Sequence, residues 1–169
     1  MLNFISTPIG NLNDISQRAI NAIRTCDYLY AEDTRITQKL LKFFELKKEC
    51  NSFHEHNEKK VTNTIIKQLL NDMSVSIVCD AGTPAISDPG YKLIQKCIEN
   101  NIKYTLLPGP SSVINALIMS GLPTDKFSFY GFFPRKESLQ ILFLEELKNE
   151  KKTSIFFESS KRIVKTIKI

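Results

Sequence analysis

The segment of residues 75–94, VSIVCDAGTPAISDPGYKLI, contains the densest group of residues that could bind a ligand. A short apolar run, Val75–Cys79, leads into Asp80-Ala81-Gly82-Thr83-Pro84 and Ser87-Asp88-Pro89-Gly90, and apolar residues return at helical spacing from Leu93. At the carboxyl end of a strand in an open α/β sheet, such a loop is where ligands bind. The simpler interpretation is a capped βα connection, but ordinary βα loops have only about 2–6 residues.

Two further loops have the same construction. The apolar run Leu2–Ser6 leads into Thr7-Pro8-Ile9-Gly10-Asn11, and the run Tyr104–Leu107 leads into Pro108-Gly109-Pro110-Ser111-Ser112. Each is followed by a helical pattern, so the three loops are expected to form three walls of one crevice. None of them is GxGxxG or GxxxxGK[ST], which argues against a dinucleotide or a nucleoside triphosphate as the ligand.

Two charged segments could take part in proton transfer. Glu32, Asp33 and Arg35 follow the apolar run 28–31, where a structural ion pair with a helix N-cap at Asp33 or Thr34 is as good an interpretation as catalysis. His54 and His56 would point to one side of an extended segment, but no third metal ligand stands out. Contact with a substrate or proton transfer near neutral pH is the better functional interpretation for these histidines.

The elements that would position these residues alternate between strand and helix. Strands are expected at 2–6, 28–31, 75–79 and 103–107, with a short strand or loop at 50–53; helices are expected at 15–25, 35–44, 60–72, 91–100 and 112–119. The helix at 60–72 is the clearest, because Val61, Ile65, Leu69 and Met73 lie four residues apart. This alternation predicts a parallel α/β sheet with helices on both faces.

A second domain is expected after the linker 120–124, SGLPT. A strand at 127–133, a helix at 137–149 and a strand at 153–158 form one βαβ unit, so the predicted domains are 1–119 and 120–169. One such unit cannot easily cover both faces of its sheet. We therefore expect residues 120–169 to be only the start of a second α/β domain.

The composition is that of an ordinary globular protein, with 42% hydrophobic and 24% charged residues. No apolar run approaches the roughly 20 residues of a membrane span, and the N-terminus lacks a signal-peptide pattern. The four cysteines are scattered without a CxxC pair, which favours reduced core residues over disulfides or zinc ligands. These features predict a cytoplasmic protein without membrane association.

The net charge of +5 is unevenly distributed along the chain. Residues 34–67 have eight basic and four acidic residues, a net +4, and residues 134–169 have nine basic and five acidic residues, also a net +4. Such blocks suit a phosphate-binding surface, although lysine-rich helix faces are often simply solvated.

Eight motifs together resemble the ribosomal RNA small-subunit methyltransferase I family of the tetrapyrrole methylase superfamily. They occur in the order expected of that family and cover nearly the whole chain: TPIGNLNDIS (7–16), AEDTR (31–35), FHEHNE (53–58), DAGTPAISDPGY (80–91), PGPSS (108–112), SGLPTDKF (120–127), GFFPRK (131–136) and FFESSKR (156–162). The resemblance implies a tetrapyrrole-methylase-like α/β fold. It also implies transfer of a methyl group from S-adenosylmethionine to the ribose 2′-hydroxyl of a cytidine in 16S ribosomal RNA.

The resemblance assigns roles to individual residues. It places the cofactor between the two domains, against Pro8, Asp80, Ala81, Gly82, Thr83, Ser87, Asp88, Ser111 and Ser112. It implies RNA contacts by Arg35, His56, Arg135, Lys136, Lys161 and Arg162. The general base is not fixed by the sequence, and Asp33 and His54 are the candidates. Loop N–H groups at a helix N-terminus could hold the methionine carboxylate, and Asp80 or Asp88 could pair with the ammonium or sulfonium.

The chain departs from the family pattern in two respects. Ala85 stands where the pattern has Gly, and the chain stops at Ile169, well before the family's second domain is complete. The expected partners are the small ribosomal subunit and a second copy in a homodimer. The alternatives are a related methyltransferase acting on a small molecule such as a porphyrinoid, or an inactive truncated remnant. The basic blocks and the HEHN segment speak against the small-molecule alternative.

Overall fold

Five parallel strands form the sheet that carries the three predicted ligand-binding loops. The computed structural model describes residues 1–169, and these strands lie in the order β3-β2-β4-β1-β5. Their bounds are β1 Leu2–Ile5, β2 Tyr28–Ala31, β3 Cys50–Ser52, β4 Val75–Val78 and β5 Tyr104–Leu107. All four residues of β4 are buried, as expected of a strand covered on both faces.

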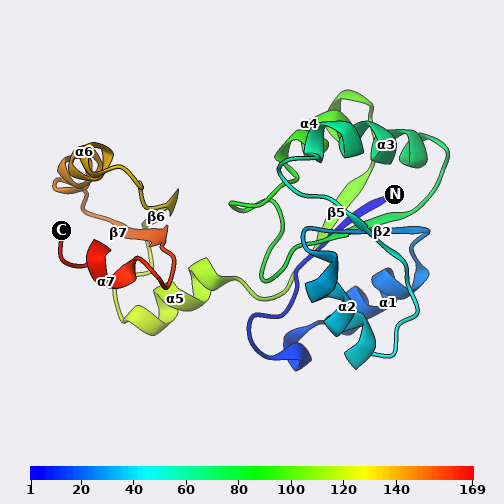
Figure 1. Cartoon of the computed structure of the whole chain (residues 1–169), viewed down its shortest axis with the longest axis horizontal. Coiled ribbons are helices and arrows are strands. Elements are labelled where there is room, and N and C mark those ends of the chain that lie inside the picture. Colours follow the sequence, from blue (N-terminus) through cyan, green and yellow to red (C-terminus); the bar gives the residue numbers. More distant parts are fainter. The chain divides into compact units, whose positions relative to one another are not determined.

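Helices cover both faces of this sheet. Alternate strand residues such as Ile5 and Val78 pack against α1 (Gln17–Thr25) and α2 (Thr34–Phe43). The intervening residues, such as Phe4 and Ile77, pack against α3 (Glu58–Leu70) and α4 (Tyr91–Glu99). Figure 1 shows these two helix pairs on opposite sides of the strands. The parallel α/β architecture expected from the sequence is therefore confirmed.

The local sequence explains where several helices begin. The Ser16 side chain accepts a hydrogen bond from the Ala19 N–H at 3.2 Å, and Asp33 accepts one from the Arg35 N–H at 2.9 Å. Both are N-cap interactions, which satisfy N–H groups that the first helical turn leaves free. A 3-10 helix, η1 (Leu12–Asp14), precedes α1, so the helix starts two residues later than the expected 15. Helix α3 starts two residues earlier than the expected 60.

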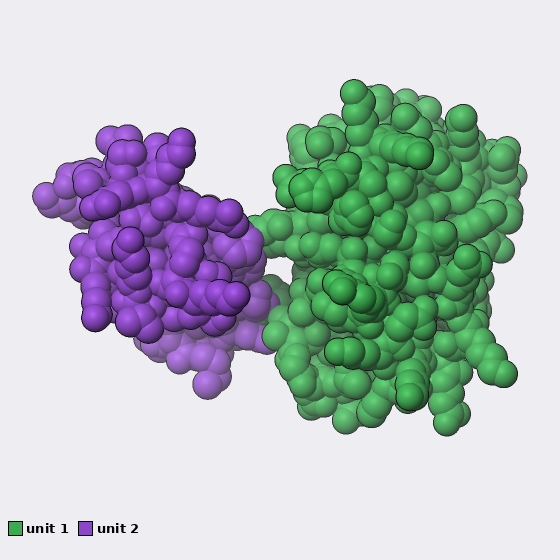
Figure 2. Space-filling model, viewed as in Figure 1, with its two compact units in different colours: residues 1–111 green, residues 112–169 purple.

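Residues 112–169 form a second compact unit, drawn in purple in Figure 2, and residues 1–111 form the first. The second unit contains α5 (Ser112–Ser120), β6 (Phe127–Phe132), α6 (Glu137–Leu147), β7 (Thr153–Phe157) and α7 (Ile163–Thr166). Strands β6 and β7 are parallel neighbours, which is the expected βαβ unit. The unit boundary lies between Ser111 and Ser112, earlier than the predicted domain boundary at 119/120, because α5 contacts β7. The short helix α7 was not predicted.

Aromatic side chains form the centre of the second unit. Phe143 of α6 packs edge-on against Tyr130 and Phe133, with ring centroids 5.3 and 5.5 Å apart. Phe156 of β7 joins this cluster. Leu142 of α6 is 65% exposed, so this face of the helix remains uncovered. None of the helices in either unit has the length and apolar character needed to span a bilayer.

Candidate functional site

The loops after β1, β4 and β5 are joined by hydrogen bonds. Thr7 and Gly82 form an isolated antiparallel bridge, with N–H to C=O distances of 2.8 and 3.0 Å. The Ser6 hydroxyl donates to Thr83 Oγ1 at 3.3 Å, and the Thr83 hydroxyl donates to the carbonyl of Pro110 at 3.2 Å. The three loops that the sequence predicts as neighbouring walls are thus brought together at one edge of the sheet.

Two glycines permit this close approach. Gly82 has a φ of +86°, in the left-handed region that favours glycine. A Cβ atom on Gly109 would lie 2.9 Å from the Cβ of Ser6, closer than side-chain atoms can pack. The backbones of the β1 and β5 loops therefore touch in a way that no other residue type would allow at position 109.

The sheet order brings the β2 and β4 loops together as well. Asp80 Oδ1 accepts a hydrogen bond from the backbone N–H of Asp33 at 2.9 Å, which joins the ends of these neighbouring strands. The connections after β1 and β4 lead to α1 and α4 on opposite faces of the sheet. Such a point, where adjacent connections diverge, is the usual place for a ligand in a doubly wound fold.

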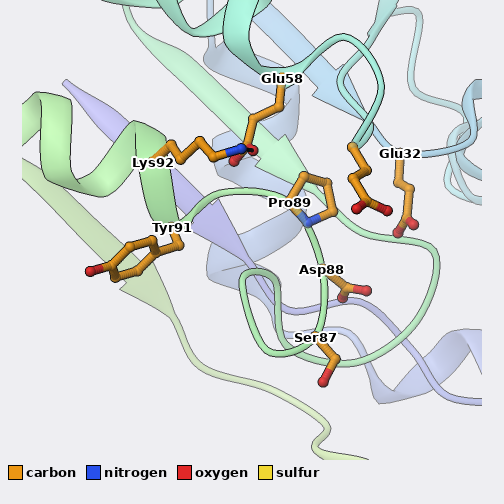
Figure 3. A pocket seen from close by; sticks show the side chains of 8 residues that line it. Glu32, Glu58, Ser87, Asp88, Pro89, Tyr91 and Lys92 are labelled. Carbon is orange, nitrogen blue, oxygen red and sulfur yellow. Dashed lines mark ion pairs between the residues drawn. The ribbon is translucent and has the colours of Figure 1, made fainter. Parts of the chain in front are cut away.

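A pocket of about 310 Å³ opens beside the β4 loop (Figure 3). It is lined by Glu32, Glu55, Glu58, Ser87, Asp88, Pro89, Tyr91 and Lys92. Of the predicted cofactor residues, only Ser87 and Asp88 line it. Asp80 and Pro8 line a smaller cavity of about 40 Å³ together with Thr7 and Cys79. Four of the predicted cofactor residues, Pro8, Asp80, Ser87 and Asp88, therefore border two cavities, whereas Ala81, Gly82, Thr83 and Ser111 line neither of them.

Three carboxyl groups at this edge have raised pKa values. Burial is the main cause for Glu32, and the negative charges of Asp88 and Asp80 raise its pKa further. Burial also raises the pKa of Asp88 and of Asp80, more than the Asp33 N–H lowers that of Asp80. A raised carboxyl pKa means that the site disfavours additional negative charge. The edge is therefore suited to a positively charged group or to holding a proton.

Asp33 and Arg35, two of the residues predicted to act in catalysis and RNA binding, are paired with each other. The Arg35 guanidinium donates to both carboxylate oxygens of Asp33, at 2.6 Å for the shortest contact, and holds the Asp33 pKa at about 2. A carboxylate with so low a pKa is a weak base. The structural interpretation left open from the sequence, an ion pair with an N-cap at Asp33, is present.

The two histidines lie in the loop after β3, with ring centroids 5.9 Å apart. The backbone N–H of His54 donates to Asn57 Oδ1 at 2.9 Å, and the Asn57 side-chain amide in turn donates to the Ser52 carbonyl at 3.2 Å. The Nδ1 atom of His54 is buried and has no hydrogen-bond partner, whereas the His56 residue is exposed. No group of three or more His, Cys, Asp or Glu side chains is arranged to hold a metal ion.

The basic residues of the second unit differ in their freedom to bind a phosphate. Arg135, Lys136 and Lys161 are exposed. Arg162 is instead paired with Glu158 at 2.9 Å and donates to the carbonyl of Pro134 at 2.9 Å. These contacts occupy the guanidinium of Arg162. They link the segment after β7 to the residues that follow β6.

The site residues expected from the sequence do not include six of the eight residues that line the pocket, namely Glu32, Glu55, Glu58, Pro89, Tyr91 and Lys92. Glu32 had been recognised only as part of a charged cluster. Glu55 and Glu58 lie within the FHEHNE motif, beside the two histidines that the sequence suggests for substrate contact or proton transfer. The sequence contains no local signal that would bring them to Asp88, because the contact depends on the order of the strands.

The comparisons with known proteins agree with this architecture. The family model for Tetrapyrrole (Corrin/Porphyrin) Methylases matches residues 1–169. Two solved structures share the fold at 16% sequence identity: a diphthine synthase, with a TM-score of 0.75 over 94% of this chain and 64% of its own, and a uroporphyrin-III-C-methyltransferase from Thermus thermophilus, with a TM-score of 0.59 over 79% of this chain and 59% of its own.

Curated relatives are closer in sequence. A Vibrio cholerae protein named Ribosomal RNA small subunit methyltransferase I is 44% identical over 99% of this chain and 58% of its own length. A Thermotoga maritima protein of the same name is 44% identical over 99% of this chain and 75% of its own length. The chain thus spans 58% of the Vibrio cholerae relative. It belongs to the tetrapyrrole methylases, and within them to the family of the proteins named ribosomal RNA small subunit methyltransferase I.

Proposed function

We propose that this chain provides the cofactor-binding edge of an S-adenosylmethionine-dependent enzyme that methylates the ribose 2′-hydroxyl of a cytidine in 16S ribosomal RNA. The observation that carries the proposal is the gathering of Glu32, Asp80 and Asp88, all with raised pKa values, beside the joined loops after β1, β4 and β5. The family membership supplies the class of reaction. Because the chain spans 58% of the Vibrio cholerae relative, methyl transfer is proposed for the whole protein and cofactor binding for this chain.

The carboxylates fit the charge of this cofactor. S-adenosylmethionine has a positive sulfonium and a positive ammonium group, and a positive neighbour favours the ionised form of a carboxyl group. Asp80 and Asp88 would pair with these charges. The rest of the proposed set comprises Pro8, Ala81, Gly82, Thr83, Ser87, Ser111 and Ser112. When bound, the cofactor supplies an electrophilic methyl group to the acceptor oxygen.

A base must accept the proton of the ribose hydroxyl, a contribution of roughly 10²–10⁴-fold in rate. Asp33 and His54 remain candidates, but the Arg35 pair makes Asp33 a weak base at a pKa of about 2. Glu32 suits the role better, because its raised pKa makes it a stronger base and its side chain lines the pocket. We therefore add Glu32 to the candidates and place it first.

Exposed cations would bind the RNA backbone. Arg35, with its side chain 87% exposed, and His56 lie on the first unit, and Arg135, Lys136 and Lys161 lie on the second. Arg35 and Arg162 are both paired with a carboxylate, but the Arg162 side chain is only 30% exposed and also donates to the Pro134 carbonyl, so we keep Arg162 as the weaker candidate. Contacts of this kind make affinity fall steeply with salt concentration. The small ribosomal subunit as substrate, a homodimer and a cytoplasmic location complete the proposal.

The first experiment is calorimetric titration of the chain with S-adenosylmethionine and with its demethylated product. Saturable binding of both is expected, and absence of binding to either would contradict the proposal. The second incubates the protein with unmethylated small subunits and tests one cytidine linkage for resistance to alkaline hydrolysis, the mark of a 2′-O-methyl group. Methylation of a base nitrogen, or of a porphyrinoid in place of the RNA, would overturn the assignment.

A further inference from the structure

Glu58 is a buried carboxylate that links the start of α3 to the start of α4. The residue is 5% exposed, and its Oε1 atom accepts a hydrogen bond from the backbone N–H of Gly90 at 3.0 Å. Its Oε2 atom lies 3.0 Å from Nζ of Lys92, the pair drawn in Figure 3. The Glu58 backbone is itself fixed, because its N–H donates to the carbonyl of His54 at 2.9 Å.

Gly90 ends a loop whose backbone is in an unfavourable conformation. Ala85 and Ser87 have φ values of +65° and +61°, and Gly90 has a φ of +138°. Left-handed conformations at non-glycine residues persist only where the surroundings hold them in place. The start of this loop is held by the bridge between Gly82 and Thr7. The end of the loop directly follows Ser87, Asp88 and Pro89, and it is held by the hydrogen bond from the Gly90 N–H to Glu58.

The position of Gly90 explains why its N–H needs a partner from Glu58. A Cβ atom there would lie 3.1 Å from both the Cβ of Ala85 and Cε1 of Phe4, so the backbone is pressed against the core. The hydrogen bond is buried. A buried N–H without an acceptor is strongly disfavoured, and a charged acceptor makes the stronger bond. Lys92 contributes less to the arrangement, because 67% of its side chain is exposed.

We infer that Glu58 is a positioning residue for cofactor binding: through the Gly90 N–H it fixes the loop that carries Ser87 and Asp88 into the pocket. Glu58 acts through the loop and does not touch the reacting atoms. The inference rests on the proposed function for the role of Ser87 and Asp88. The anchoring of the loop by Glu58 does not depend on that function and can be tested by itself.

The test compares substitutions at Glu58 in the 169-residue chain. Glu58→Ala removes both contacts, Glu58→Asp keeps the charge but shortens the reach, and Glu58→Gln keeps an acceptor for the Gly90 N–H. Lys96→Met is the control, since it removes an exposed ion pair between Lys96 and Glu99, both on α4 and away from the loop. Two quantities are measured: amide hydrogen exchange at residues 85–88 and at Gly90, and affinity for S-adenosylhomocysteine. Exchange in β4 reports whether each variant remains folded.

We expect Glu58→Ala and Glu58→Asp to speed Gly90 exchange by about tenfold or more and to weaken ligand binding by a similar factor, as loss of a charged hydrogen bond predicts. Glu58→Gln should restore both to within about threefold, and Lys96→Met should change neither. If Glu58→Ala does not fold, Glu58→Asp compared with Glu58→Gln decides the question.

The outcomes separate this inference from the proposed function. Unchanged Gly90 exchange in Glu58→Asp would overturn the anchor. Faster exchange with unchanged affinity would overturn the positioning role. If the unmodified chain does not bind S-adenosylhomocysteine, the cofactor assignment fails and the positioning role with it, while the exchange data still decide whether Glu58 anchors the loop.

Discussion

Asp80 and Asp33 are joined by a hydrogen bond of 2.9 Å from the Asp33 backbone N–H to the Asp80 carboxylate. The bond uses one carboxylate oxygen of Asp80 and leaves the other for a ligand. It also ties the end of β4 to the end of β2, the strand that carries Glu32 into the pocket. Asp80 is therefore both a structural contact and a candidate ligand-binding group, and substitutions can separate the two roles.

Replacing Asp80 with Ala should weaken S-adenosylmethionine binding by roughly tenfold or more, because charged hydrogen bonds contribute about 1.5–3 kcal/mol. Asp80→Asn keeps an acceptor for the Asp33 N–H but loses the charge. If Asp80 pairs with the cofactor, both variants bind weakly in calorimetric titration. Wild-type affinity in Asp80→Asn with weak binding in Asp80→Ala would limit Asp80 to a structural role, and unchanged affinity in both would remove it from the site.

Glu32 should make the protein less stable as the pH rises. Burial and the charges of Asp88 and Asp80 raise its pKa in the folded state, so the folded chain keeps this proton to a higher pH than the unfolded chain. Its contribution is thus fully present below the unfolded pKa and is lost as the pH rises from there through the folded pKa. Glu32→Gln cannot ionise, so we expect it to match the wild type in urea unfolding near pH 4 and to be the more stable at pH 7.

The same Glu32→Gln variant tests catalysis. If Glu32 accepts the ribose proton, methyl transfer to small subunits by the whole protein should fall by about 10²–10⁴-fold. A more stable but inactive variant would mark Glu32 as a residue kept for function. Full activity in Glu32→Gln would return attention to His54, with His54→Gln as the next variant. Lys96→Met, on an exposed part of α4, is the control for both measurements.

The sequence predicted the arrangement of elements well because strands and helices alternate along the chain and each leaves its own pattern of apolar residues. Val75–Val78 was recognisable as a buried strand from its continuous apolar run, and α3 from apolar residues four apart. The Pro- and Gly-containing loops were recognisable because turn residues are local signals. Expectations of this kind depend on residues adjacent in the chain.

The pocket could not be predicted in the same way. Glu32, Glu58 and Asp88 come from three separate segments, and their proximity depends on β4 pairing with β2 and on α3 packing beside α4. Likewise, the pair of Arg162 with Glu158 depends on a helical turn at the end of the chain that had no strong periodic signal. Arg162 therefore looked equivalent in sequence to the other predicted RNA-binding residues of the second unit, although Arg162 is paired and the others are exposed.

The thiols should react slowly in the folded protein. Burial raises the pKa of Cys79 to about 12 and the pKa values of Cys50 and Cys97 to about 11, so little thiolate is present at pH 8. Mass spectrometry after treatment with iodoacetamide should show little alkylation at these three residues in buffer and full alkylation in urea. Rapid alkylation of Cys79 in buffer would show that the β4 loop opens readily.

Gly109→Ala should destabilise the first unit by about 1–3 kcal/mol, the usual effect of forcing an additional carbon into a packed contact. Its Cβ would lie 2.9 Å from that of Ser6, and the loops after β1 and β5 would have to separate. Gly10→Ala is the control: it adds the same atom in open space and has only the strain of a φ of +84°. Urea unfolding measures both. Equal effects would indicate that backbone strain, and not the contact with Ser6, determines the result.

Ala85→Gly tests the departure from the family pattern. Ala85 has a φ of +65°, a conformation that is unfavourable by about 1–2 kcal/mol for a residue with a Cβ atom. Glycine removes this strain but increases the entropy of the unfolded chain, at a cost of about 0.4–1 kcal/mol. The net change in the free energy of unfolding should therefore lie between zero and a gain of about 1.6 kcal/mol. Ala81→Gly is the matched control, since Ala81 is exposed and does not have a positive φ, so only the entropic loss applies.

Urea unfolding should rank Ala85→Gly above Ala81→Gly. If both variants lose the same stability, the loop does not store strain at Ala85.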